Sequence, residues 1–137
     1  MVKMPKIERK LRNLRKLVKE SRLEFQGEGG DRIVFALDDK RVIKIPLHQW
    51  GIHMNEKELS LYQEDESGRF AEILDVKRPF GILCLIQERV QVMWTPYDDF
   101  DADEVPSMPY WACELLDGEQ VGVAACGDIK VYDYACE

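Results

Sequence analysis

Hydrophobic positions near the beginning of the chain follow a helical period. Between residues 6 and 22 they recur at steps of three and four, which places them on one stripe of a helix. Most of the other positions are charged, and no Gly or Pro interrupts the segment. The pattern therefore predicts an amphipathic helix over residues 6–22. Its apolar stripe consists of Ile7, Leu11, Leu14 and Val18.

After residue 22 the pattern changes to short β-rich runs separated by turn residues, with one further helical segment at 52–65. Residues 94–109 contain several prolines and acidic residues, which favours a loop. The runs expected to be strands are 32–37, 41–46, 70–76, 82–88, 121–123 and 129–133.

This order of elements predicts an α+β fold. We expect an antiparallel sheet of about five strands with one helix across it, preceded by a basic amphipathic helix and followed by a C-terminal β-hairpin. The chain is accordingly divided into the basic helix at 1–22 and a single domain at 23–137, which includes the acidic, proline-containing loop at 94–109.

Composition narrows the functional classes. Of the 137 residues, 45% are hydrophobic and 33% are charged, as in ordinary globular proteins. No apolar run approaches the roughly 18 residues of a membrane span, so we expect no membrane association. The cysteines form no Cys-x-x-Cys pair and have only two histidines beside them, so we predict no metal site and reduced thiols. They are Cys84, Cys113, Cys126 and Cys136.

Charge is distributed unevenly along the chain. Residues 1–22 hold nine Lys or Arg against two Glu, a balance of +7, whereas the remaining residues have a balance of −14. Such an asymmetry of charge bears on which partners the chain attracts and on how it assembles, and not on its fold. Three alternatives remain for the basic helix: its stripe packs on its own domain with the charges in water, residues 3–22 bind nucleic acid or a membrane surface, or the stripe pairs two copies as a homodimer.

One constellation carries a resemblance to a known family. A glycine-containing turn lies between two strands, a Lys lies inside the next strand, and a Glu lies on the next helix. This arrangement resembles the small lobe of the protein-kinase-like fold, in which the glycine loop covers the phosphates and the Glu orients the Lys. The residues that the resemblance assigns to nucleotide binding are Gly27, Gly29, Gly30, Lys44 and Glu58.

Two further stretches extend the resemblance. Gly51 to Tyr62 reads Gly-Ile-x-x-Asn-x-x-Glu-x-x-x-Tyr, which is similar to small kinase-like proteins carried by bacteriophages and prophages. The C-terminal hairpin ends at Asp133-Tyr134, where the family has Asp-Phe-Gly or Asp-Tyr-Gly. The resemblance therefore adds Asp133 to the nucleotide site, as a magnesium ligand.

Departures from the family pattern argue against catalysis. Leu115 stands where the family has its catalytic Asp, and Gln120 stands where it has a metal-binding Asn. We therefore predict no catalytic residue and no required cofactor. The alternative is an ATP- and magnesium-dependent phosphotransferase with atypical residues, in which Glu114 is the base and Asp133 holds the metal.

The function predicted from these observations is protein–protein binding. The resemblance implies a non-catalytic, pseudokinase-like protein of phage or prophage origin in the cytoplasm of a bacterial host. Its acidic body fits a host or phage protein with a basic surface, and inhibition of a bacterial defence or nucleic-acid-processing system is the expected outcome. The predicted partner-binding residues are Asp98, Asp99, Asp101, Asp103 and Glu104.

Overall fold

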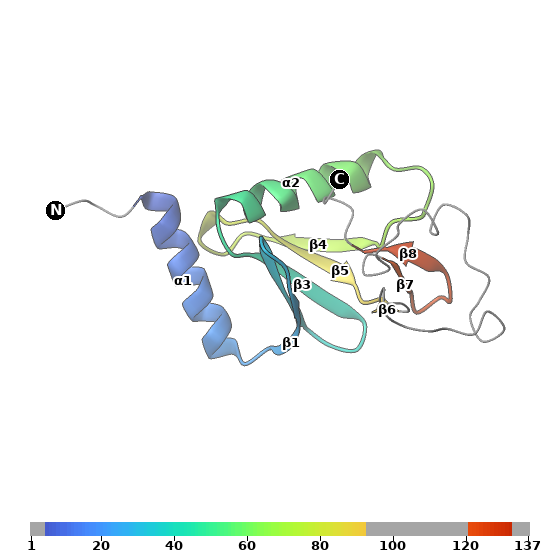
Figure 1. The fold of residues 1–137 in the computed structure, drawn as a ribbon, viewed down its shortest axis with the longest axis horizontal. Helices are drawn as coiled ribbons and strands as arrows, with labels where there is room; N and C mark the ends of the chain where they lie inside the picture. The colour runs from blue at the N-terminus through green and yellow to red at the C-terminus, as the bar shows by residue number, and fades with distance from the viewer. Residues whose placement is uncertain (1–4, 93–120, 133–137) are drawn as a thin grey trace.

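The structure is a computed structural model that describes residues 5–92 and 121–132. Over these ranges the chain forms the predicted α+β fold, with two helices, a five-stranded sheet and a three-stranded sheet (Figure 1). The elements are α1 (Lys6–Ser21), β1 (Glu24–Glu28), β2 (Arg32–Ala36), β3 (Arg41–Pro46), α2 (Gln49–Glu64), β4 (Ile73–Lys77), the 3-10 turn η1 (Pro79–Gly81), β5 (Cys84–Glu88), β6 (Gln91–Val92), β7 (Val121–Val123) and β8 (Ile129–Val131).

The larger sheet is antiparallel throughout and has the strand order β1-β2-β3-β5-β4. Its two hairpins follow the turn signals of the sequence, and Val34 of β2 lies opposite Lys44 of β3. In Figure 1, α2 runs along the sheet, whereas α1 and the smaller sheet lie at opposite ends of the molecule. The larger sheet therefore separates the basic helix from the C-terminal strands.

Several elements differ from the sequence prediction: β1 forms at Glu24–Glu28, and the strand expected over 82–88 begins at Cys84. The strand expected over 70–76 begins only at Ile73, because Phe70 instead forms a bridge with Val131 of β8. Helix α2 begins at Gln49 rather than at residue 52. The C-terminal hairpin gains a third strand, β6, which pairs with β7.

Side chains of the large sheet alternate between two faces, as the period of a strand requires. One face packs against α1, and it carries Ile33, Phe35, Ile43, Ile45 and Cys84. The opposite face borders a cavity, and it carries Val34, Val42 and Lys44. The strand pattern thus produces an apolar face for α1 and a mixed face for the candidate site.

Helix α1 belongs to the core of the molecule. Leu11 and Leu14 are almost completely buried and pack with Ile45, Ile82 and Cys84. Ile7 and Val18 pack against this cluster, so the whole predicted stripe faces the chain's own domain. Complete burial of a leucine side chain contributes about 1.5–3 kcal/mol. In this structure Ile7, Leu11, Leu14 and Val18 pack on their own domain, as the first of the three alternatives expects, and pairing of two copies stays a prediction.

No helix within residues 5–92 and 121–132 combines the length and the apolar character needed to cross a membrane.

Candidate functional site

The structure brings Lys44 and Glu58 into direct contact. Lys44 extends from β3 and Glu58 from α2, and Lys44 Nζ lies 2.6 Å from Glu58 Oε1. Both residues are buried, with 3% and 0% of their surface exposed. An ion pair shielded from water in this way is far less screened than a surface pair. Residues 14 positions apart in the sequence thus form one charged unit between helix and sheet.

A second cation, which the sequence analysis missed, joins this pair. The guanidinium of Arg32, at the start of β2, contacts the other carboxylate oxygen of Glu58. Its Nη1 also donates a hydrogen bond to Asn55 Oδ1 at 3.1 Å. The alternation of side chains along a strand could have indicated this contact. Arg32 lies two positions before Val34 and therefore on the same face of β2, and Val34 lies opposite Lys44. Arg32, Lys44 and Glu58 form what we call the ion cluster, which carries one more positive than negative charge.

Asn55 connects the ion cluster to the backbone of the sheet. Its Nδ2 donates to the carbonyl oxygens of Lys44, at 3.2 Å, and Leu83, at 2.9 Å. A buried amide with all these partners fixes the helix against β3 and against the residue just before β5. Asn55 precedes Glu58 by three positions, so both lie on the helix face that is turned toward the sheet.

Gly51 allows the same face of α2 to approach β3 closely. A Cβ atom at this position would clash with the carbonyl oxygen of Asp31 and lie 3.1 Å from the Cα atom of Pro46. The stretch Gly-Ile-x-x-Asn-x-x-Glu therefore has a physical explanation: Gly51 permits the approach, Asn55 ties the backbones together, and Glu58 holds the two cations.

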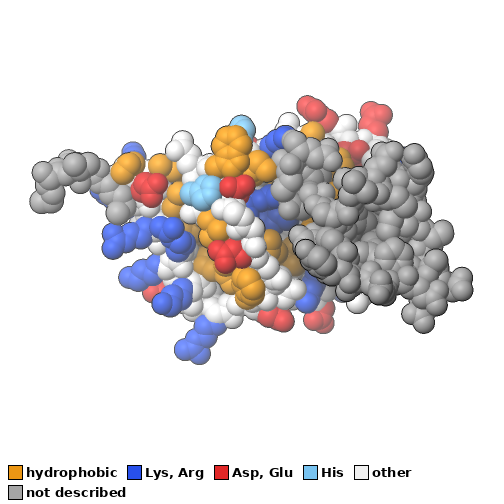
Figure 2. Space-filling view, viewed as in Figure 1, with side chains coloured by type: hydrophobic (Ala, Val, Ile, Leu, Met, Phe, Trp, Pro, Cys, Tyr) orange, Lys and Arg blue, Asp and Glu red, His pale blue; other side chains and the backbone are white. Residues whose placement is uncertain are grey.

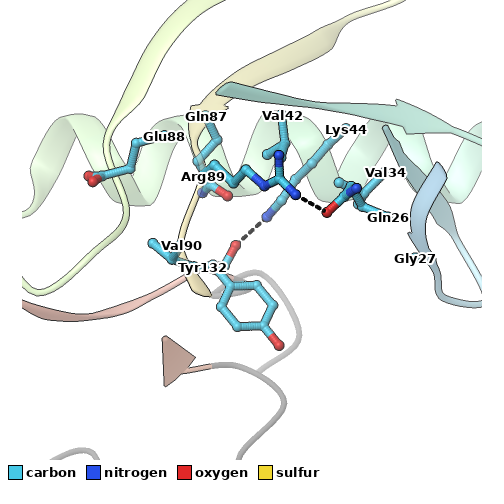
Figure 3. Close-up of a pocket in the computed structure, with 10 residues that line it drawn as sticks. All are labelled: Gln26, Gly27, Val34, Val42, Lys44, Gln87, Glu88, Arg89, Val90 and Tyr132. Atoms are coloured by element: carbon cyan, nitrogen blue, oxygen red, sulfur yellow. Dashed lines mark hydrogen bonds between the residues drawn. The ribbon is translucent and has the colours of Figure 1, made fainter. Parts of the chain in front are cut away.

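A cavity of about 210 Å³ adjoins the ion cluster (Figure 3). The first three strands form one side of it, and the segment after β5 and the C-terminal hairpin form the others. Its lining is mostly apolar apart from Lys44 and a few polar side chains. The lining residues are Gln26, Gly27, Val34, Val42, Lys44, Gln87, Glu88, Arg89, Val90 and Tyr132.

Tyr132, which directly follows β8, lines one side of this cavity. Lys44 Nζ donates a hydrogen bond to the Tyr132 carbonyl oxygen (Figure 3). The same ammonium group also contacts Glu58. The ammonium group is therefore held between a carboxylate and a backbone carbonyl. The backbone carbonyl of a residue 88 positions away in the sequence thus accepts a hydrogen bond from the lysine that faces the cavity.

The C-terminal hairpin is anchored at this place by further contacts. Ala71 donates its backbone N–H to the Val131 carbonyl oxygen at 2.7 Å. Lys130 Nζ lies 2.8 Å from Glu88 Oε2, and this hydrogen bond raises the pKa of Lys130. These contacts fix the hairpin to the end of β5 and to the segment that precedes β4.

The predicted glycine loop is a tight hairpin turn. Gly29 donates its backbone N–H to the Arg32 carbonyl oxygen at 2.9 Å, and His48 Nε2 lies 2.9 Å from the Gly30 carbonyl oxygen. Of the three glycines, Gly27 borders the cavity, and an added Cβ there would meet no atom within 4 Å. Gly29 and Gly30 form the turn itself, so only Gly27 leaves space beside the cavity.

Other predicted positions lie outside the described residues. These include Asp133, the alternative base Glu114, and the partner-binding set Asp98, Asp99, Asp101, Asp103 and Glu104. Within the described ranges, no group of three or more His, Cys, Asp or Glu side chains is placed to hold a metal ion.

No protein-family model matches the chain, and no curated protein is detectably similar to it in sequence.

Proposed function

We propose that this chain is a non-catalytic binding protein with the architecture of a kinase small lobe, of the phage or prophage type. One observation carries the proposal. Glu58 orients Lys44 as it would in such a lobe, but the ammonium group that would hold nucleotide phosphates already donates a hydrogen bond to the Tyr132 carbonyl. A phosphate would have to displace the chain's own C-terminal segment from this cation.

The dimensions of the cavity support the same proposal. Its volume of about 210 Å³ is below the roughly 300–1,000 Å³ that ligand pockets usually have. A specific observation nevertheless favours the ATP-dependent phosphotransferase as the second candidate: Val34 and Val42 form an apolar wall beside Lys44, which suits a flat heterocyclic ring. The two candidates differ in whether ATP displaces Tyr132 from Lys44.

The partner that we propose is a host or phage protein with a basic surface in the bacterial cytoplasm. Residues 23–137 have a charge balance of −14, and a body of this sign attracts basic surfaces over distances of about 8–10 Å at physiological salt. Basic surfaces of this kind occur in proteins that process nucleic acid. Inhibition of such a protein, including one of a bacterial defence system, follows if the acidic body occupies that surface.

Thermal unfolding with ATP and magnesium tests the choice between the two candidates. We expect no shift in the unfolding midpoint of the full chain, because the Tyr132 carbonyl already accepts a hydrogen bond from the ammonium group of Lys44. A ligand at about 100 times its dissociation constant would instead add about 2.7 kcal/mol of stability. Stabilisation that disappears in Asp133→Asn would overturn the proposal in favour of the phosphotransferase, whereas stabilisation that persists in that variant would indicate nucleotide binding without a bound metal.

Charge reversal tests the proposed partner surface. A variant with Lys at Asp98, Asp99, Asp101, Asp103 and Glu104 should retain less of the host protein captured by the parent chain. The matched control reverses five exposed acidic residues elsewhere and therefore has the same net charge. Its substituted positions are Glu24, Asp39, Glu56, Glu64 and Glu66. Equal capture by the parent and the first variant would contradict the assignment of this surface.

A further inference from the structure

The exposed side of α1 is a cationic surface. Among the described residues, none of its basic side chains forms an ion pair. Figure 2 shows Lys and Arg side chains gathered at the end of the molecule where α1 lies. We call this surface the α1 cationic face. Its exposed members are Lys6, Arg9, Arg12, Arg15, Lys16, Lys19 and Arg22.

The packing of α1 restricts what this face can bind. An amphipathic helix at a lipid surface inserts its apolar side between the acyl chains. Here Leu11 and Leu14 are buried against the sheet, with 1% and 2% of their surface exposed. In this packing the helix has no apolar stripe to offer a membrane or a second copy. Recognition through this face must depend on charge and on the groups at its border.

An exposed aromatic residue stands at that border. Helix α1 packs against η1, and a Cβ added at Gly81 would lie 3.5 Å from Lys10 Nζ. In the middle of η1, Phe80 has a φ of 54° and is 47% exposed. A bulky residue in the left-handed region is strained, and such strain is concentrated at functional sites. The backbone thus maintains Phe80 in an unfavourable conformation one position before Gly81, at the place where η1 meets α1 near Lys10, and the exposed Arg78 lies two positions earlier in the chain.

We propose that the α1 cationic face and Phe80 form a binding site for a single nucleic-acid strand. The basic side chains would contact phosphates, and the ring of Phe80 would stack on a base, as in other surfaces that bind single strands. This inference does not depend on the proposed function, because it uses a different face and a different ligand.

The length of the helix fits such a strand. Sixteen residues span about 24 Å, or about seven phosphates at the roughly 3.4 Å spacing of a duplex strand. This number is within the range of roughly 4–16 nucleotides for single-strand sites. Four of the seven exposed cations are arginines, whose planar guanidinium matches phosphate oxygens. The aromatic group favours a single strand over a duplex, because only an unstacked base can stack on it.

Fluorescence anisotropy with labelled oligonucleotides of about twelve nucleotides tests the proposal on the full chain. Single-stranded DNA and RNA are compared with a duplex of the same sequence. We expect a single strand to bind more tightly than the duplex, and affinity to fall about 1,000-fold between about 50 and about 200 mM salt for roughly seven phosphate contacts. The oligonucleotide that binds more tightly, DNA or RNA, shows which of the two nucleic acids the site prefers.

Two pairs of variants locate the site. Arg12→Glu with Arg15→Glu should weaken binding about 10-fold or more. The control Lys40→Glu with Arg41→Glu makes an equal charge change at the end of the β2–β3 turn and the start of β3, and it should weaken binding less than about threefold. Phe80→Ala should weaken binding about fivefold or more, and Leu74→Ala, which removes a comparably exposed apolar side chain, should leave it unchanged. Unfolding midpoints verify that each variant is folded.

Several results would overturn the proposal. These are the absence of oligonucleotide binding at about 50 mM salt, equal losses in the two charge variants, unchanged binding by Phe80→Ala, and a duplex bound as tightly as the single strand. Binding to phosphatidylserine vesicles without binding to oligonucleotides would also overturn it, in favour of a lipid surface.

Discussion

Lysine and arginine serve opposite purposes in two regions of this molecule. In the ion cluster, Arg32 and Lys44 are buried and share the carboxylate of Glu58. On the α1 cationic face, basic side chains are exposed and form no ion pair with the described residues. The same residue types therefore hold the fold together in one place and create an external field in the other. Burial and pairing, rather than residue type, decide which role a cation has.

The energetics of the two regions differ accordingly. A buried ion pair gains little net stability relative to a well-packed apolar core, but removing one partner leaves an uncompensated charge that costs several kcal/mol. Exposed charges are solvated with or without a partner, so removing one changes stability little. They act instead on the rate and the salt dependence of association.

Removing the carboxylate of the ion cluster should have the largest effect on stability. Glu58→Ala leaves Lys44 and Arg32 buried without a counter-charge, so we expect the free energy of unfolding to fall by about 3–5 kcal/mol. Urea denaturation monitored by circular dichroism measures it. The control Glu56→Ala removes an exposed carboxylate from the same helix and should change it by less than about 0.5 kcal/mol. Similar losses in both variants would contradict the contrast between the two regions.

The apolar side of α1 gives the next largest effect. Leu14→Ala creates a cavity between helix and sheet and should lower the free energy of unfolding by about 2–4 kcal/mol. Leu17 lies on the same helix but is 43% exposed, so Leu17→Ala should lower it by less than about 1 kcal/mol. The same denaturation experiment measures both. Equal, small losses would mean that α1 does not rest on the sheet.

The thiol beneath α1 provides a pH test of the same core. Burial raises the pKa of Cys84 from its ordinary value of 9.0 to about 12. The folded state therefore keeps a proton that the unfolded state releases above about pH 9, so this contribution to stability is complete below pH 9 and is lost as the pH rises toward 12. Between about pH 8 and pH 10, the protein should lose about 1 kcal/mol more than Cys84→Ala. Identical pH profiles for the protein and the variant would show that this thiol ionises freely in the folded state.

The smallest effect on stability is expected on the α1 cationic face. Arg12→Gln with Arg15→Gln should change the free energy of unfolding by less than about 0.5 kcal/mol, because both side chains are exposed and form no ion pair with the described residues. Denaturation in urea measures this change. A loss above about 1 kcal/mol would mean that these cations are structural, which would remove the distinction between the two regions.

Much of the fold could be predicted from local patterns. The helix at the beginning of the chain and the hairpins around Asp38 and Gly127 follow from residue periods and turn residues, which act over a few positions. The start of β4 could not be predicted in this way, because Phe70 takes its partner, Val131, from a segment far along the chain. The candidate site was predictable only in part: Lys44 and Glu58 carried a motif, whereas Arg32 did not.

The sequence by itself determined both helices, most of the strands and where charge accumulates, because helical and strand periods and charge balance are properties of neighbouring residues. Only the tertiary structure decided that the stripe of α1 is covered by the sheet, that Arg32 shares Glu58, and that the Tyr132 carbonyl accepts a hydrogen bond from Lys44. These contacts join residues many positions apart, and packing selects them by burial and by the need to pair every buried charge.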